Sequence, residues 1–297
     1  MKSWLKKLYR KMHRRNNVFT PLVTVSISRS AIIHNLDEFR RPSDISSREH
    51  SNIRLVAPVL KSNAYGHGLI LIAEILREQN VPFFVIDSHF EARALRNEKI
   101  ITPLLIIGYS SIETILENNL KDIRFTITSI DFLKELTEKT SDKINKKITI
   151  HLKIDTGMHR QGISVEEVDM ALGIIESSKN IVLEGICSHL ADADNANSTF
   201  TDNQISIWNK IVNKTKEKFP SLLYWHISAT SGYSFTKANA NLIRLGIGLY
   251  GIDCEPNDEL KEKSLINLKP ALEMTTVISE TKKIKNGDHV GYNCTFT

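Results

Sequence analysis

The sequence predicts an α/β fold, a (β/α)8 TIM-like barrel followed by the beginning of a β-rich C-terminal domain. From Pro21 onward, short β-branched or apolar runs alternate with stretches of helical periodicity. This alternation is typical of βαβ units and a parallel sheet. The 297 residues exceed the 200–250 that an α/β barrel occupies, and the pattern changes after Gly251. Counting elements alone leaves a doubly wound open sheet as the alternative.

Nine runs are expected to form strands, one more than an eight-stranded barrel needs. The first is the best candidate to lie outside the barrel, because the long polar stretch 40–54 separates it from the next. The expected strands are 23–27, 55–60, 82–86, 103–107, 124–127, 148–153, 181–187, 223–227 and 243–249. The stretches with helical periodicity include 31–39, 69–76, 132–138, 165–175 and 204–219.

The domain limits follow from changes in composition. We expect a basic leader over 1–20, the barrel with its linker over 21–262, and an incomplete C-terminal β domain over 263–297. Residues 272–281 and 288–297 are predicted as strands around a Lys-Asn-Gly-Asp turn. Two strands do not form a stable domain alone, so we expect the chain to stop near the start of that domain.

The net charge of +5 comes from the leader, whose first 15 residues hold seven positive residues and no acid. The remainder has 32 positive against 34 negative residues, which argues against nucleic-acid binding. The apolar spacing in the leader is amphipathic. A solvated basic extension is favoured over a helix that contacts a membrane surface or a partner.

The three cysteines, Cys187, Cys254 and Cys294, form neither a disulfide framework nor a metal knuckle. Their use is typical of a reducing compartment, so we expect a cytoplasmic protein. No apolar run of 18 residues is present. We predict no metal site, because no set of side chains has the spacing of metal ligands. His151 and His226 are interpreted as core or strand-end histidines.

The strongest chemical signal is the segment Val-Leu-Lys-Ser-Asn-Ala-Tyr-Gly-His-Gly over 59–68. Lys61 directly follows a buried strand, and barrel enzymes carry their catalytic groups at the carboxyl ends of strands. A lysine amine there is able to form a Schiff base. Gly66 and Gly68 allow a sharp turn behind it, and Tyr65 offers a hydroxyl.

This segment resembles the pyridoxal-phosphate lysine segment of the alanine racemase family. Further similar blocks follow in the family's order, at 151–162, 188–191, 228–232, 243–251 and 287–292. The resemblance covers roughly residues 21–297. It implies pyridoxal 5'-phosphate as the cofactor, an amino acid as the substrate, and a homodimer whose active sites are shared across the interface.

The resemblance also assigns roles to matching residues. Lys61 would hold the cofactor as an aldimine and then act as a base. Arg244 would face the pyridine nitrogen, and His189 would orient this arginine. Guanidinium stays protonated, which keeps that nitrogen unprotonated and favours racemisation. The phosphate would be bound by four residues, Tyr65, Ser231, Gly246 and Ile247.

Three further residues carry implied roles. Arg160 would bind the substrate carboxylate through its planar fork, and Lys153 is a possible carbamylated lysine. A structural ion pair is the alternative for each. Tyr292 would act as the second base from the partner subunit, since racemisation needs a proton donor on each face of the Cα atom. Thr230 stands where many members have asparagine, and Leu245 where many have proline.

The expected function is therefore interconversion of L-alanine and D-alanine by a two-base Lys/Tyr mechanism, supplying D-alanine for bacterial peptidoglycan. Three alternatives stay open: a pyridoxal-phosphate-binding or homeostasis protein that does not racemise, an inactive truncated racemase, and a racemase of serine or of broad specificity.

Overall fold

The computed structural model describes residues 21–41, 55–140, 146–195, 198–233, 238–254 and 266–296. The predicted leader and most of the predicted linker lie outside these residues. Strands and helices alternate along the chain, and the predicted α/β class is confirmed. Two compact units are present and are described separately, Ser28–Ala271 and a smaller unit built from segments near both ends of the chain.

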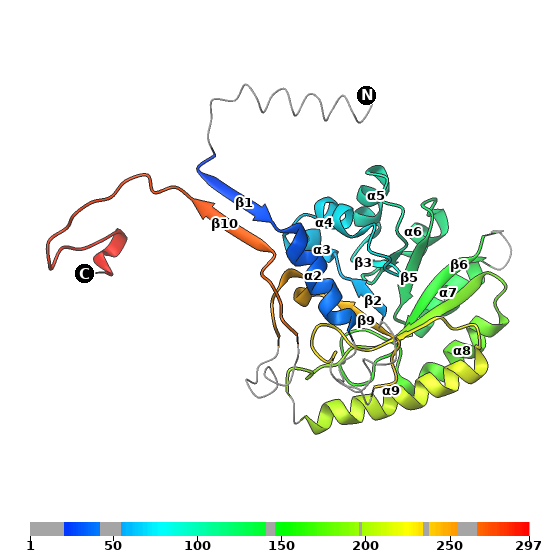
Figure 1. Ribbon diagram of the computed structural model, residues 1–297. Helices are drawn as coiled ribbons and strands as arrows, with labels where there is room; N and C mark the ends of the chain where they lie inside the picture. Colours follow the sequence, from blue (N-terminus) through cyan, green and yellow to red (C-terminus); the bar gives the residue numbers. More distant parts are fainter. Residues whose placement is uncertain are drawn as a thin grey trace. The chain divides into compact units, whose positions relative to one another are not determined.

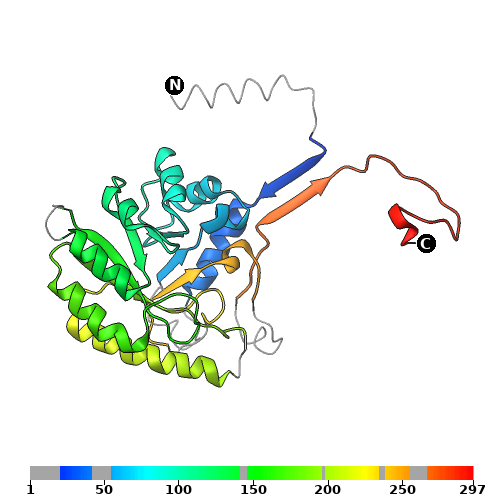
Figure 2. The same ribbon diagram turned by 180° about the vertical axis from the view of Figure 1, so that it is seen from behind.

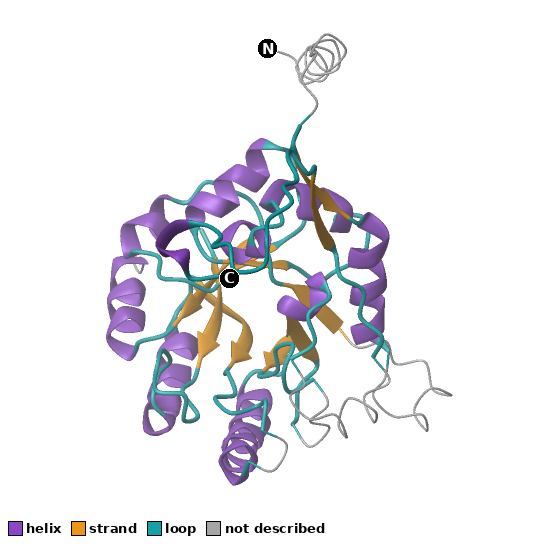
Figure 3. Ribbon diagram, turned by 90° about the vertical axis from the view of Figure 1, so that its left-hand side faces the viewer, coloured by secondary structure: helices purple, strands orange, loops and turns teal. Residues whose placement is uncertain are grey.

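The larger unit is a barrel of eight strands. They are β2 (Leu55–Pro58), β3 (Phe84–Ile86), β4 (Leu104–Ile106), β5 (Ile123–Ile127), β6 (Ile148–Lys153), β7 (Ile181–Cys187), β8 (Tyr224–His226) and β9 (Leu242–Leu245). Strands β3 to β8 pair in parallel in chain order, and β2 pairs in parallel with β9. In Figures 1 to 3 the helices lie around the outside of these strands.

Hydrogen bonds at two seams join these sheets into a closed barrel. Between β2 and β3, Val59 bridges to Val85, and Leu60 N donates to Val85 O at 2.7 Å. Between β8 and β9, Asn241 N donates to Trp225 O at 3.1 Å. All eight strands are parallel where pairing is assigned, so their carboxyl ends meet at one rim, where barrel enzymes bind substrates.

The helices are α2 (Arg29–Arg40), α4 (Leu69–Leu76), α5 (His89–Asn97), α6 (Ile112–Glu117), α7 (Ile130–Thr140), α8 (Val168–Ser177) and α9 (Thr199–Lys218). Serine side chains cap four of them by accepting a backbone N–H, namely Ser28, Ser88, Ser111 and Ser198. Helices α5 and α6 were not among the predicted stretches. Among the described residues, no helix has the length and apolar character needed to cross a membrane.

Apolar side chains from β2, β3, β4 and β9 fill part of the barrel interior. Val85, Leu105 and Leu242 are buried there together with Phe83. The Phe83 ring meets the rings of His151 and Tyr224 edge-on, with centroids 5.5 and 5.1 Å apart. The apolar core therefore borders a group of buried polar side chains.

The smaller unit pairs strands from the two ends of the chain. Strand β1 (Val23–Ile27) runs antiparallel to β10 (Leu272–Thr276), with Val23 opposite Thr276 (Figures 1 and 2). The prediction that the first strand lies outside the barrel is thus confirmed. The domains expected from the sequence were continuous segments that met at residue 262. The strand pair instead joins β1, which lies before this limit, to β10, which lies after it.

The predicted strand over 288–297 is wrong. Val290 and Phe296 form an isolated bridge, and a 3-10 turn occupies Tyr292–Cys294. Gly291 and Asn293 have φ angles of 77° and 58°, which are incompatible with an extended strand. Strand β10 also ends at Thr276, five residues earlier than expected.

Candidate active site

Lys61 begins a left-handed turn at the carboxyl end of β2. The turn spans Lys61–Tyr65, and the φ angles from Ser62 to Tyr65 lie between 53° and 56°. Left-handed helical residues cost roughly 1–2 kcal/mol each for L-amino acids. Such strain persists only where the surroundings fix the backbone, and it is found at functional sites.

Specific hydrogen bonds hold this turn. Asn63 Oδ1 accepts from Leu69 N at 2.9 Å, which caps the start of α4. The Glu91 carboxylate accepts from Asn63 N at 3.3 Å and from Asp87 N at 2.8 Å. Gly66, at φ 87°, donates its N–H back to Ser62 O and Asn63 O. Several hydrogen bonds therefore fix the backbone of the turn that begins at Lys61.

The ring of Tyr250 packs against side chains of this turn and of the residues that follow it. Its ring centroid is 5.4 Å from that of Tyr65 and 4.2 Å from that of His67. Its hydroxyl donates to Val59 O at 3.0 Å. Burial raises the pKa of Tyr250, so the hydroxyl stays protonated as a donor. Sequence analysis gave this tyrosine no role, although it lies in one of the family-like blocks.

A second turn follows β9 and meets Tyr65. The Thr230 hydroxyl oxygen accepts from Gly246 N and from Gly248 N, each at 3.1 Å. A Cβ atom at Gly246 would lie 3.1 Å from the Tyr65 hydroxyl. The structure therefore brings together Tyr65 and Gly246, two of the predicted phosphate-binding residues, at a turn whose backbone N–H groups donate to an oxygen atom.

The other two predicted phosphate-binding residues are adjacent in sequence to this turn. Ile247 lies between the two glycines, and its N–H makes no hydrogen bond within the described residues. Ser231 follows Thr230 and is half-buried. Residues 246–251 also have the spacing G-x-G-x-x-G after a strand, a phosphate-binding signal in the sequence that was missed.

Arg244 is buried in the barrel, with 7% of its surface exposed. Its Nη1 donates to His226 Nδ1 at 2.5 Å and to His226 O at 2.9 Å. Its Nη2 donates to Ser188 O at 2.7 Å, and lies 3.0 Å from His189 Nδ1. Within the described part of the chain, Nε takes no hydrogen bond. One N–H of a rigidly held guanidinium is thus available to a ligand.

His189 lies within a group of positive charges. Burial is the main cause that brings the pKa of His189 to about 3. Four cations lower it further: Arg244, Arg160, Lys153 and Lys61. The neutral ring keeps a lone pair on Nδ1 for Arg244. The cations that surround it suit a ligand with more than one negative charge.

Lys153 and Arg160 form no ion pair with a carboxylate among the described residues. Burial lowers the pKa of Lys153, and the nearby Arg244 and Arg160 act in the same direction. Lys153 Nζ donates to Gln161 Oε1 at 3.3 Å. Arg160 is exposed. The structure thus offers no support for the alternative of a simple ion pair at these two positions.

Tyr292 belongs to the smaller unit, where its side chain is 98% exposed. Within the described residues, no group of three or more histidine, cysteine or acidic side chains is placed to hold a metal ion.

The fold and site define a class: an α/β barrel whose rim carries a lysine turn, a glycine turn and a cluster of cations. A family model described as alanine racemase, N-terminal domain, matches residues 27–254. An alanine racemase of Methanococcus maripaludis is 32% identical over 276 residues, covering 92% of this chain and 71% of that protein. The chain belongs to the alanine racemase family.

Solved structures agree with this assignment. An alanine racemase from Bacillus anthracis with bound L-Ala-P is 26% identical, with a TM-score of 0.77 over 94% of this chain and 70% of that one. A histidine racemase from Leuconostoc mesenteroides is 25% identical, with a TM-score of 0.76 over 94% and 73%. Relatives with different substrates therefore share this fold.

Proposed function

We propose that this chain forms the pyridoxal-phosphate site of an amino-acid racemase acting on alanine. The observation that carries the proposal is the convergence of Lys61, the glycine turn at Gly246 and the guanidinium of Arg244 at one end of the barrel. Each supplies a different part of what the cofactor requires: an amine, a phosphate cradle and a donor for the ring nitrogen.

The residues fit this cofactor. A Cβ atom at residue 246 would crowd the Tyr65 hydroxyl at 3.1 Å, so glycine at this position leaves more space beside that hydroxyl. The free N–H of Ile247 and the hydroxyl of Ser231 add donors for phosphate oxygens. The N–H of Gly246 already donates to the Thr230 hydroxyl. It can also bind a phosphate oxygen only if it donates to both oxygens.

The chemistry follows from these positions. Pyridoxal phosphate, when bound, withdraws electrons from the substrate Cα and so acidifies its C–H bond. Lys61 Nζ binds the cofactor and then takes or returns the proton on one face of Cα. Arg244 donates from Nε and remains a cation, which limits electron withdrawal. Arg160 pairs with the substrate carboxylate.

Tyr292 supplies the proton on the opposite face, from the second subunit of a homodimer. Its exposure in this chain suits a residue whose site is completed by another copy. The product, D-alanine, would serve bacterial peptidoglycan. A histidine racemase of the same fold keeps the alternative of serine or broader specificity open.

Lys153 is proposed to be carbamylated. Its lowered pKa leaves more of the neutral amine that attacks CO2. An N–C bond forms, one proton leaves the nitrogen, and a carboxylate results. That negative charge would balance Arg160.

The test is covalent labelling. Pyridoxal phosphate is added to the purified chain, the adduct is reduced with borohydride, and peptides are mapped by mass spectrometry. The pyridoxyl group is expected on Lys61, absent in Lys61→Ala and retained in Lys210→Ala, which removes an exposed lysine of α9. Labelling elsewhere, or no uptake by folded protein, would refute the site.

Formation of D-alanine from L-alanine is measured on the same preparations. Labelling of Lys61 without racemisation would instead favour a cofactor-binding protein that does not racemise, or an inactive racemase. Comparing L-serine and L-histidine as substrates addresses specificity.

A further inference from the structure

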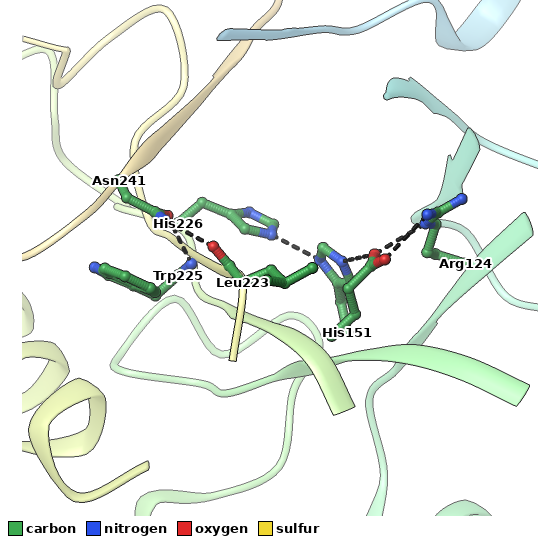
Figure 4. Close-up of polar contacts among 7 residues, drawn as sticks. Arg124, His151, Leu223, Trp225, His226 and Asn241 are labelled. Carbon is green, nitrogen blue, oxygen red and sulfur yellow. Dashed lines mark hydrogen bonds and ion pairs between the residues drawn. The ribbon is translucent and has the colours of Figure 1, made fainter. Parts of the chain in front are cut away.

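A continuous row of polar side chains crosses the barrel from Arg124 to Arg244. Arg124 donates to Glu184 through Nε at 2.9 Å and through Nη2 at 3.0 Å. His151 Nε2 lies 3.2 Å from Glu184 Oε2, and His151 Nδ1 lies 2.8 Å from His226 Nε2 (Figure 4). Arg244 Nη1 completes the row at His226 Nδ1.

Only one arrangement of protons satisfies every contact. The ionised carboxylate of Glu184 can only accept, so His151 must carry its proton on Nε2. His151 Nδ1 is then an acceptor, and His226 must donate from Nε2. His226 Nδ1 is left as an acceptor, and the guanidinium of Arg244 can only donate to it. Every hydrogen bond between Arg244 and Glu184 therefore donates in the direction of Glu184, which also accepts from Arg124 on its other side.

The charges agree with this arrangement. Burial lowers the pKa of His151 and His226, and the charge of Arg244 lowers the pKa of both further. Both rings are fully buried. Burial alone would raise the pKa of Glu184, but hydrogen bonds from His151 and Arg124 outweigh it and bring the pKa to about 2. The row thus has a cation, Arg124 or Arg244, at each end, with an ionised Glu184 beside Arg124 and two neutral rings between Glu184 and Arg244.

The backbone of β7 is irregular at the residues that take part in this row. The pairing register of β6 and β7 shifts so that His151 lies opposite Gly185 and the extra residue is Glu184. Bulges of this kind redirect side chains. A Cβ atom at residue 185 would lie 2.7 Å from His151 Cε1. Glycine at this position therefore provides the space that the imidazole occupies.

We propose that Glu184, His151 and His226 are positioning residues that hold the Arg244 guanidinium in one orientation, with its Nε directed to the ligand. Gly185 makes room for this row. The inference rests on the proposed function only for the identity of the ligand that Arg244 meets. In the part of the chain that the structure describes, no hydrogen bond or ion pair joins Arg124 or Glu184 to the lysine turn or the glycine turn, so we infer that they act on the site through the histidines.

The first test reads the protons directly. The full chain is labelled with 15N-histidine and studied without ligand by long-range 1H–15N correlation, with spectra of His151→Gln and His226→Gln used for assignment. Both rings are expected to be neutral at pH 7 and protonated on Nε2. A proton on Nδ1 of either ring, or an imidazolium at pH 7, would overturn the proposal. This readout does not depend on pyridoxal phosphate or on racemisation.

The second test separates positioning from folding by two matched glycine substitutions. Gly185→Ala places a methyl group against His151, whereas Gly173→Ala on α8 has no atom within 4 Å of its new Cβ. Gly185→Ala is expected to change the 15N shifts of His226 and His189, and to weaken pyridoxal-phosphate binding about tenfold. Gly173→Ala should change neither.

Glu184→Gln supplies an independent variant. It replaces one carboxylate oxygen by an NH2 group, which would face either Arg124 or His151 donor to donor. Mixed tautomers at His151 and His226 are expected, with circular dichroism unchanged. If Gly185→Ala and Glu184→Gln fold and leave both histidines and cofactor affinity as in the unmodified chain, the row is structural only. Absence of cofactor binding in the unmodified chain would refute the proposed function but not the proton arrangement.

Discussion

Removing the hydroxyl of Thr230 is expected to loosen the glycine turn selectively. Thr230→Val keeps the shape of the side chain but removes the oxygen that accepts from Gly246 N and Gly248 N. Thr230 is buried, so water cannot fully replace that oxygen. Losing two neutral hydrogen bonds at about 1 kcal/mol each gives a cost of about 2 kcal/mol. This equals a change of roughly 30-fold in the local opening equilibrium.

Amide hydrogen exchange, followed by mass spectrometry of the peptide over 244–250, measures this change. Thr230→Val should exchange up to about 30-fold faster there than the unmodified chain. Thr230→Ser is the matched control, because it keeps the acceptor and loses only a methyl group, at about 1 kcal/mol. Equal exchange in Thr230→Val and the unmodified chain would refute the role of the hydroxyl, as would exchange in Thr230→Ser as fast as in Thr230→Val.

Three other predictions concern pH and the second base. Stability should fall as pH drops from 7 to 5, because the pKa of His189 is lowered to about 3 and unfolding lets the ring take up a proton; urea midpoints at each pH measure this. Below pH 4.5 the protonation of Glu184 should remove no more than about 3 kcal/mol, a loss that is absent in Glu184→Gln. Tyr292→Phe should keep labelling of Lys61 while slowing racemisation by about 10²–10⁴-fold, and mixing it with Lys61→Ala subunits should restore part of the activity. Full activity of Tyr292→Phe would contradict the two-base role, and hybrids that form without activity would contradict the shared site.

Most of the barrel could be predicted because its strands are local apolar runs. Bounds of β6 and β7 agree with the predicted ranges, and the surplus first strand was recognised by counting. Helices α5 and α6 escaped prediction because each buries only two apolar side chains, which gives a weak periodic pattern, although Ser88 and Glu91 at the start of α5 have the spacing of a capping box. The turn Tyr292–Cys294 depends on positive φ angles at Asn293 and Cys294, which residue type alone does not indicate.

The site was predictable only where its residues lie in contiguous motifs. Lys61 and Arg244 were predicted from such motifs, and the structure places both in the barrel. Glu184 was not predicted, because the position of its side chain depends on a register shift between two strands. His151 and His226 were expected to be core histidines, and both are buried; their contact joins residues 75 positions apart. Long-range contacts of this kind leave no periodic or local signal in the sequence.

The pairing of β1 with β10 also has a consequence for biosynthesis. The 244 residues from Ser28 to Ala271 separate the two strands. At ribosomal rates of roughly 5–20 residues per second, β1 emerges on the order of 10–50 s before its partner exists. During that interval Val23 and Val25, which are exposed even in the finished pair, belong to an unpaired strand edge of the nascent chain. Closing so long a loop is entropically unfavourable until the barrel has brought Ser28 and Ala271 within hydrogen-bond distance, so β1 should be among the last elements to order.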